Sequence, residues 1–242
     1  MVEYLNASLV SVYKNWDTIP EIIIVTDGTP TELIKNKLIK WPQKIEIQTW
    51  EYCCKGINYQ GKDELYQYAA KNIWGKKFSS ICYYSEKYPI LYSDTDILWF
   101  APPIIEDFKK GTIIKMCQDV GYYYSTLLLD ALQQQHIFNY TPLNAGLIYA
   151  NGNISSFPQW QQLTNYLVQN PEHFSEQTAF AILNNYFNPG INFKREEIFI
   201  QIDDMYSMKY TKKYYPKIWA RHYVNLKSTC FWRDFVYLLM GR

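Results

Sequence analysis

Two aspartates one residue apart, Asp94 and Asp96, stand between two apolar segments of the chain. We expect buried strands at residues 88–92 and 97–100, so that both carboxylates lie at a strand end. Two carboxylates at this spacing repel each other, and a nearby cation normally offsets the cost. A hard divalent ion is the natural candidate, because it can bridge carboxylates and phosphate oxygens. The pattern therefore predicts a metal site that handles a phosphorylated substrate.

Three further segments place polar residues at the boundaries of predicted elements. Residues 142–149 are a turn that runs into a buried strand, and they include Asn144. Residues 175–180 are the capped start of a helix and begin Ser-Glu-Gln. Residues 220–223 include His222, and a lysine, Lys227, follows shortly after. With the aspartate pair, these segments form an ordered set of four.

Alternating helices and strands must position these side chains. Apolar periodicity predicts helices at residues 3–15, 31–39, 62–74, 77–85, 156–169 and 175–187 and at the end of the chain, with a break at Gly75. Short apolar segments predict strands at residues 21–26, 44–50, 88–92, 97–100, 112–118, 143–150, 198–202 and 218–223, and residues 122–135 are a loop or a helix. This order predicts an α/β fold with a mostly parallel, buried sheet in a single domain spanning residues 1–242.

Composition narrows the classes of function. A chain of 242 residues with 48% hydrophobic residues can bury a sizeable core. The net charge of +1 gives no electrostatic reason to expect binding to nucleic acid or to a membrane surface. We expect no transmembrane segment and no signal peptide, because no apolar run has the required length or flanks. The five cysteines are odd in number and form no CxxC pair, which predicts reduced thiols and a cytoplasmic protein.

The ordered set of four segments resembles the GT-A glycosyltransferases, nearest to glycosyltransferase family 8 and related DxD transferases. In that family an apolar strand ends in DxD, an N-[AT]-G strand and a [DE]-Q helix start follow, and a late histidine precedes a basic residue. The resemblance spans residues 21 to 232 and implies a GT-A, Rossmann-like central sheet flanked by helices. Two parts depart from the family pattern. The first family strand is missing before the helix at 3–15, or lies upstream in a longer protein, and residues 222–228 lack the family's glycine and Pro-Trp pair.

The resemblance implies a metal site and a donor site. Asp94, Asp96 and His222 would hold Mn²⁺ or Mg²⁺, and a set of carboxylates with an imidazole suits Mn²⁺ somewhat better. Asp94 would also face the hydroxyl groups of the donor. Contacts to the rest of the nucleotide-sugar would come from Asp27 at the nucleobase, from the basic residues Lys76 and Lys77, and from Lys227 at the diphosphate.

The remaining implied roles concern the reacting sugar. Asn144, Ala145 and Gly146 would line the donor sugar and acceptor pocket, with Gly146 at a place where no side chain fits. Glu176 and Gln177 would lie on the reacting face of the sugar. A carboxylate or an amide there would stabilise developing positive charge.

The activity that the resemblance implies is transfer of a sugar from a nucleotide-diphospho-sugar, with a UDP-sugar favoured, to a glycan, lipid or protein acceptor. Family 8 transfers with retention of configuration. An inverting enzyme would need a carboxylate base, and Glu176 could be that base. An inactive GT-A-like binding or scaffold protein is a second interpretation. A haloacid dehalogenase-like phosphatase is a third, because Asp94 and Asp96 form a D-x-D pair and Asp203 and Asp204 form a later acidic pair.

Each motif also has a purely structural interpretation. Asp94 and Asp96 could be a solvated turn, and His222 a histidine of the core. Glu176 and Gln177 suit the first turn of any helix, where the helix dipole favours acidic residues. Lys76 and Lys77 could be a solvated face, and Asp27 with Gly28 a turn. The ordered combination of motifs, rather than any single one, supports the enzyme hypothesis.

Overall fold

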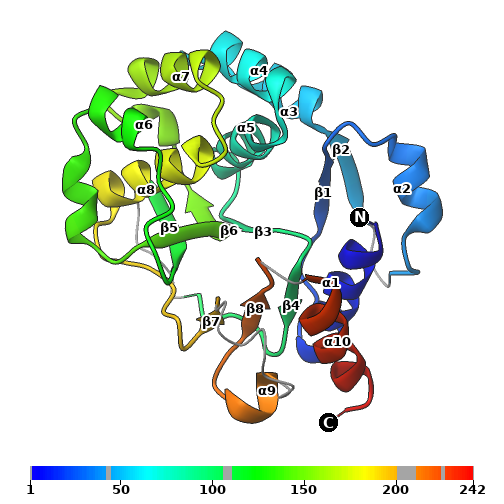
Figure 1. Cartoon of the computed structure of the whole chain (residues 1–242). Coiled ribbons are helices and arrows are strands. Elements are labelled where there is room, and N and C mark those ends of the chain that lie inside the picture. Colours follow the sequence, from blue (N-terminus) through cyan, green and yellow to red (C-terminus); the bar gives the residue numbers. More distant parts are fainter. Residues whose placement is uncertain (1, 42–44, 106–110, 201–210, 225–226, 242) are drawn as a thin grey trace.

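The computed structural model describes residues 2–41, 45–105, 111–200, 211–224 and 227–241, which form an α/β arrangement (Figure 1). The helices are α1 (Val2–Asn15), α2 (Thr31–Lys37), α3 (Trp50–Gly56), α4 (Lys62–Lys71), α5 (Ile73–Ser85), α6 (Thr126–Ala131), α7 (Trp160–Gln169), α8 (Ser175–Phe187), α9 (Thr211–Tyr214) and α10 (Trp232–Leu239). Short helical turns are η1 (Gln135–Asn139), η2 (Ile154–Ser156) and the π-helical η4 (Lys227–Phe231). No helix of the described residues is long and apolar enough to cross a bilayer.

The strands form three small sheets rather than one large sheet. They are β1 (Ile23–Thr26), β2 (Glu46–Thr49), β3 (Ile90–Ser93), β4 (Ile97–Trp99), β5 (Ile113–Gln118), β6 (Leu143–Asn151), β7 (Ile198–Phe199) and β8 (Ala220–His222). Their orders are β1-β2, β3-β6-β5 and β4-β8-β7. The predicted strand at 198–202 is described only for its first residues, because residues 201–210 lie outside the described part of the chain.

The expectation of a mostly parallel sheet is wrong for these strands. Only β1 with β2 and β7 with β8 run parallel, whereas β3 with β6, β5 with β6 and β4 with β8 are antiparallel. Strand β6 explains the error, because all of its residues from 143 to 150 are buried. A strand covered on both faces has a continuous apolar sequence whatever its direction, so the apolar run carries no information on direction.

Helices α5 and α8 pack on the central β3-β6-β5 sheet, and α4 and α7 lie beyond them (Figure 1). The break predicted at Gly75 is wrong, because α5 begins at Ile73 and contains this glycine. Asn72 caps the helix by accepting a hydrogen bond of 2.7 Å from the Gly75 amide. A side chain at Gly75 would collide with the Tyr68 carbonyl of α4, so the glycine permits close helix packing.

Helix α3 follows β2 directly and was not anticipated. The predicted strand at 44–50 ends at Thr49, whose hydroxyl accepts a hydrogen bond from the Tyr52 amide and caps the helix. This helix buries Cys53 and Cys54, and burial raises the pKa of each thiol to about 11. All five cysteines are buried and free.

The junction between two sheets positions the aspartate pair. The chain leaves β3 at Ser93 and enters β4 at Ile97, so Asp94 and Asp96 bridge the β3-β6-β5 and β4-β8-β7 sheets. On one side, the Asp94 amide donates to the Gly146 carbonyl of β6 at 2.8 Å. On the other side, β4 pairs with β8 so that Ile97 lies opposite His222. Strand pairing therefore brings three distant segments together at this junction.

Candidate metal centre

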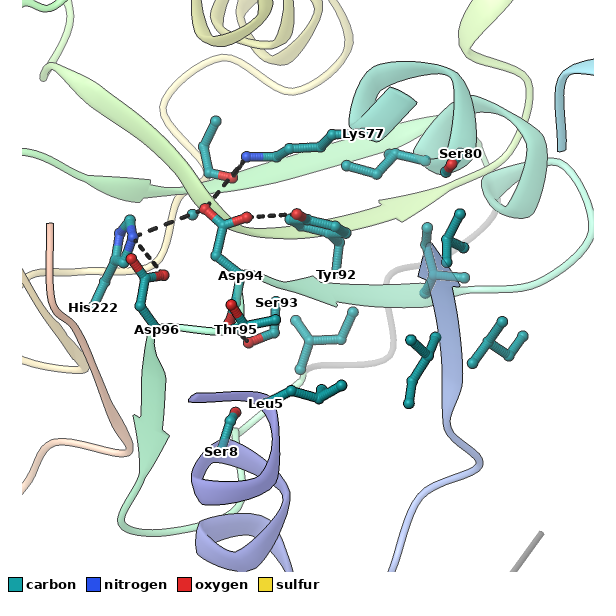
Figure 2. Close-up of a pocket in the computed structure, with 18 of the residues that line it drawn as sticks. Leu5, Ser8, Lys77, Ser80, Tyr92, Ser93, Asp94, Thr95, Asp96 and His222 are labelled. Carbon is teal, nitrogen blue, oxygen red and sulfur yellow. Dashed lines mark hydrogen bonds and ion pairs between the residues drawn. The ribbon is translucent and has the colours of Figure 1, made fainter. Parts of the chain in front are cut away.

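Asp94, Asp96 and His222 converge at the sheet junction (Figure 2). One ligand atom from each residue lies within 4.8 Å of the others. The Nε2 atom of His222 is 3.4 Å from Asp96 Oδ1 and 3.8 Å from Asp94 Oδ2. Asp96 and His222 are buried, and Asp94 is half-buried. Among the described residues, this is the cluster whose ligand atoms could hold a metal ion.

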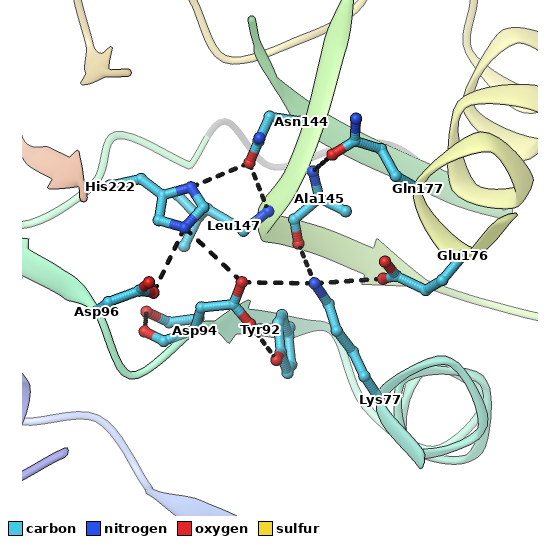
Figure 3. A network of polar contacts seen from close by, with 12 residues as sticks. Lys77, Tyr92, Asp94, Asp96, Asn144, Ala145, Leu147, Glu176, Gln177 and His222 are labelled. Carbon is cyan, nitrogen blue, oxygen red and sulfur yellow. Dashed lines mark hydrogen bonds and ion pairs between the residues drawn. The ribbon is translucent and has the colours of Figure 1, made fainter. Parts of the chain in front are cut away.

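Asn144 fixes the orientation of the imidazole (Figure 3). The Asn144 Nδ2 atom donates to Asp119 Oδ2 at 3.0 Å, and the Gly146 amide donates to Asn144 Oδ1 at 2.8 Å. The amide oxygen of Asn144 therefore faces His222 Nδ1, 3.0 Å away. In a neutral ring this contact places the proton on Nδ1 and leaves the Nε2 lone pair facing the two carboxylates, as metal ligation requires.

Gly146 is needed for the histidine to occupy this position. A Cβ atom at residue 146 would overlap the His222 imidazole ring. The family resemblance implied that no side chain fits at Gly146, beside the donor sugar, and in the structure the His222 ring fills the space of a Cβ atom there. Backbone, amide and imidazole therefore depend on one another in this part of the site.

Lys77 of α5 lies between the metal cluster and α8 (Figure 3). Its Nζ atom is 3.6 Å from Asp94 Oδ2 and 3.2 Å from Glu176 Oε1, and it donates to the Ala145 carbonyl at 2.7 Å. Only 13% of the side chain is exposed. Burial alone would lower the pKa of Lys77, but the charges of Asp94 and Glu176 outweigh it and raise the pKa. The lysine therefore stays charged and connects Asp94 to Glu176 across the site.

Glu176 and Gln177 begin α8 and close the far side of the site. Glu176 is only 3% exposed, and burial raises its pKa to about 7, although the charge of Lys77 opposes the shift. Gln177 accepts a hydrogen bond from the Ala145 amide at 3.2 Å and donates to the Tyr123 carbonyl at 2.9 Å. The helix start thus places a carboxyl group in the site and ties β6 to the loop before α6.

Asp27 and Lys76 lie farther away, at the β1 side of the same cavity. The Lys76 ammonium donates to the Asp27 carbonyl and lies 5.4 Å from the centre of the Trp50 ring. Both residues line an open cavity of about 1950 Å³ that also contains the metal cluster. The structure does not test the role predicted for Lys227, because its side chain lies outside the described part of the chain, as do Asp203 and Asp204.

Two residues of the site were missed by the sequence analysis. Asp119 is buried directly after β5 and holds the Asn144 amide. Tyr92 of β3 donates its hydroxyl proton to Asp94 Oδ1, and its ring lies 4.9 Å from the Lys77 ammonium. The sequence did indicate Asp119, because this carboxylate follows the predicted strand at 112–118 directly. No sequence pattern distinguishes Tyr92 from the other tyrosines of the core.

The arrangement brings together three groups with different chemical properties. It offers two carboxylates and an oriented imidazole to a divalent ion, a buried ammonium to an anion, and a carboxyl group that can exchange its proton near neutral pH. Comparison of the chain with protein-family models, with curated proteins and with solved structures gives no match.

Proposed function

We propose that this chain is a metal-dependent glycosyltransferase of GT-A type, similar to family 8, that uses a nucleotide-diphospho-sugar donor. One observation carries the proposal. Asp94, Asp96 and His222 converge beside Lys77 and Glu176 in one cavity of about 1950 Å³. The cavity is large enough for a nucleotide-sugar together with part of an acceptor.

The donor set fits Mn²⁺ or Mg²⁺. Two carboxylates provide hard oxygen ligands, and the His222 Nε2 lone pair is free for an ion because Nδ1 is engaged by Asn144. When bound, such an ion would act as a Lewis acid that balances the charge of a diphosphate leaving group. The buried Lys77 ammonium would add a second positive charge on the sugar side of the diphosphate.

Glu176, Gln177 and Asn144 have different roles in this proposal. Glu176 faces the reacting sugar across from the metal, where its charge would stabilise an oxocarbenium-like sugar. Gln177 and Asn144 hold Ala145 and His222 in place rather than react themselves. We propose retention of configuration, because the Glu176 carboxylate is occupied by its ion pair with Lys77 at 3.2 Å. The anomeric configuration of the product, read by NMR, tests this choice.

The donor is proposed to be a UDP-sugar. Asp27 and Lys76 lie on the β1 side of the cavity, away from α8, where a nucleobase and ribose would extend from a diphosphate at the metal. The assignment of uridine follows from the family resemblance alone. The first experiment is therefore a comparison of nucleotides.

The test measures thermal stability with UDP, GDP, CMP or dTDP, each with and without Mn²⁺. A ligand that binds only the folded state adds about 2.7 kcal/mol at a hundredfold excess over its Kd. We expect this stabilisation with UDP, only when Mn²⁺ is present. The variant Asp96→Ala should lose it, whereas Asp130→Ala should keep it, because Asp130 is an exposed residue that contacts Gln135.

Each contrary outcome points to a different function. No stabilisation by any nucleotide with Mn²⁺, in a cooperatively folded protein, would contradict donor binding and favour an inactive GT-A-like protein. Metal-dependent hydrolysis of p-nitrophenyl phosphate that is lost in Asp94→Ala would favour the phosphatase alternative. Nucleotide binding that persists in Asp96→Ala would remove the metal cluster from the donor site.

A further inference from the structure

Four aromatic side chains from three separate segments contact one another at the edge of the cavity. Trp74 of α5 lies 4.7 Å from His173, and His173 lies 4.5 Å from Phe174, as measured between ring centres. Phe174 in turn lies 6.0 Å from Tyr123, with the two ring planes 31° apart. We call these four residues the aromatic wall. All of them line the same cavity as the metal cluster.

The aromatic wall is continuous with the polar part of the site. Trp74 precedes Lys77 by three residues on α5, so the two side chains lie on the same side of the helix. Phe174 directly precedes α8, two residues before Glu176. The backbone of Tyr123 accepts the hydrogen bond from Gln177. Each part of the wall is therefore held by the element that also positions Lys77, Glu176 or Gln177.

Lys77 links the metal cluster to the start of α8, and the aromatic wall adjoins that helix start at Phe174. The Lys77 ammonium contacts Asp94 of the cluster at 3.6 Å and Glu176 of α8 at 3.2 Å. Metal cluster, lysine and glutamate are therefore linked by contacts, and Phe174 of the wall lies two residues before the glutamate in the chain. In the proposed donor arrangement, with the diphosphate at the metal and the sugar at Glu176, the wall lines the same cavity as the reacting sugar.

Exposure makes the wall available to a ligand. Phe174 is 39% exposed and Tyr123 is 38% exposed, although aromatic rings are normally buried. An apolar ring surface beside amide and carboxyl groups is typical of small-molecule sites, in which apolar contact gives affinity and few polar groups give orientation. A pyranose ring has the matching chemistry, with an apolar face of C–H groups and a rim of hydroxyl groups.

We propose that the aromatic wall is the acceptor subsite and that it binds a pyranose ring of a glycan acceptor, with Phe174 and Tyr123 contacting the face of the sugar. The name acceptor subsite rests on the proposed function. The sugar-binding property itself does not depend on donor binding. The subsite selects a glycan over a lipid or an unglycosylated protein as the acceptor.

The experiment measures binding of the methyl glycosides of glucose, galactose, mannose and N-acetylglucosamine by saturation-transfer NMR, with UDP and Mn²⁺ present. We expect at least one glycoside to bind. Phe174→Ala and Tyr123→Ala should each weaken binding about three- to tenfold, the range typical of one aromatic contact. Phe174→Tyr should retain binding, and Phe174→Leu should not, because it keeps the apolar bulk but loses the ring.

Phe138→Ala is the matched control. Phe138 is also 39% exposed and contacts Tyr122 and Tyr124, but it does not line the cavity. Equal loss of glycoside binding in this variant would overturn the proposal. So would glycoside binding that is unchanged in Phe174→Ala, or no glycoside binding by a protein that binds UDP and Mn²⁺. Competition by tetramethylammonium would overturn it as well, because it would identify a cation site.

Failure of the proposed function has a different signature. Suppose that UDP with Mn²⁺ does not bind, that a glycoside does bind, and that its binding is weakened in Phe174→Ala. The donor assignment then fails, and the sugar subsite stands. Binding of UDP with Mn²⁺ should be the same in Phe174→Ala as in the unmodified protein. These two measurements on the same samples separate the two proposals.

Discussion

Replacing Asp119 by Asn should disorder the metal cluster, although Asp119 is not one of its ligands. Asp119 accepts two hydrogen bonds, from the Val120 amide on Oδ1 at 2.7 Å and from Asn144 Nδ2 on Oδ2 at 3.0 Å. An asparagine has only one side-chain oxygen and cannot accept both. One donor of residue 120 or 144 would then face an NH₂ group. If Asn144 rotates its amide to avoid this, its NH₂ group faces His222 Nδ1.

The expected size of the effect follows from these contacts. One buried donor without an acceptor costs about 1–3 kcal/mol of stability. A rotated Asn144 also requires His222 Nδ1 to accept, which transfers the ring proton to Nε2, where it faces the carboxylates. Removal of an outer hydrogen-bond partner from a metal-bound histidine typically lowers metal affinity by about 10- to 100-fold. We expect a loss of that size for Mn²⁺ in Asp119→Asn.

Calorimetric titration with Mn²⁺ measures the loss, and urea denaturation measures the stability. Asp130→Asn is the matched control, because Asp130 accepts a hydrogen bond from Gln135 on the surface and contacts no residue of the site. It should bind Mn²⁺ with unchanged affinity. An unchanged Kd for Mn²⁺ in a folded Asp119→Asn protein would refute the chain of contacts from Asp119 through Asn144 to His222.

Three further substitutions test other parts of the structure. Gly146→Ala places a methyl group in the space of the His222 ring, so Mn²⁺ affinity measured by titration should fall at least about tenfold, and an unchanged affinity would contradict this packing. Glu176 keeps its proton up to about pH 7 when folded, against a usual value of 4.5, so its contribution to stability is present below pH 4.5 and is lost as the pH rises to about 7. The free energy of unfolding of the unmodified protein should therefore fall by about 3 kcal/mol over this range relative to that of Glu176→Gln, as measured by denaturant titration at each pH. An equal dependence on pH in the two proteins would disprove the raised pKa of Glu176. Asp234→Asn removes a charge that pairs with Arg221 at 3.3 Å in a fully buried network. The free energy of unfolding in urea should fall by about 3–5 kcal/mol, whereas a fall below about 1 kcal/mol would show that stability does not depend on the pair.

Local features of the fold were predictable from the sequence. Helices α1 and α7 have clear apolar periodicity, and strands β1, β3 and β6 are apolar runs ended by polar residues. The family resemblance implied that Asp94, Asp96 and His222 act together, and the structure does bring them together. Helix α3 was missed because the sequence continues from β2 with Trp-Glu-Tyr, which suits a strand as well as a helix.

Sheet direction and the outer contacts of the site could not be predicted. The contact between Asp119 and Asn144 depends on an irregular register between β5 and β6, in which Met116 pairs with Ile148 but Cys117 pairs with Asn144. This irregularity brings the Asp119 amide to the Pro142 carbonyl at 2.7 Å. Periodicity describes one segment at a time and contains no information on such a shift between two segments.

The balance of charge is the strongest physical argument for a cation at the sheet junction. Lys77 is shared between Asp94 and Glu176, at 3.6 and 3.2 Å. Asp96 instead faces His222 Nε2 at 3.4 Å, and the hydrogen bond to Asn144 assigns a lone pair to that nitrogen. A lone pair facing a buried carboxylate is unfavourable unless a proton or a metal ion lies between them. A divalent ion at this position would balance the charges of Asp94 and Asp96 and accept the lone pair of His222 at once. The proposal of a metal-dependent enzyme therefore rests on how the imidazole is held as much as on the two aspartates.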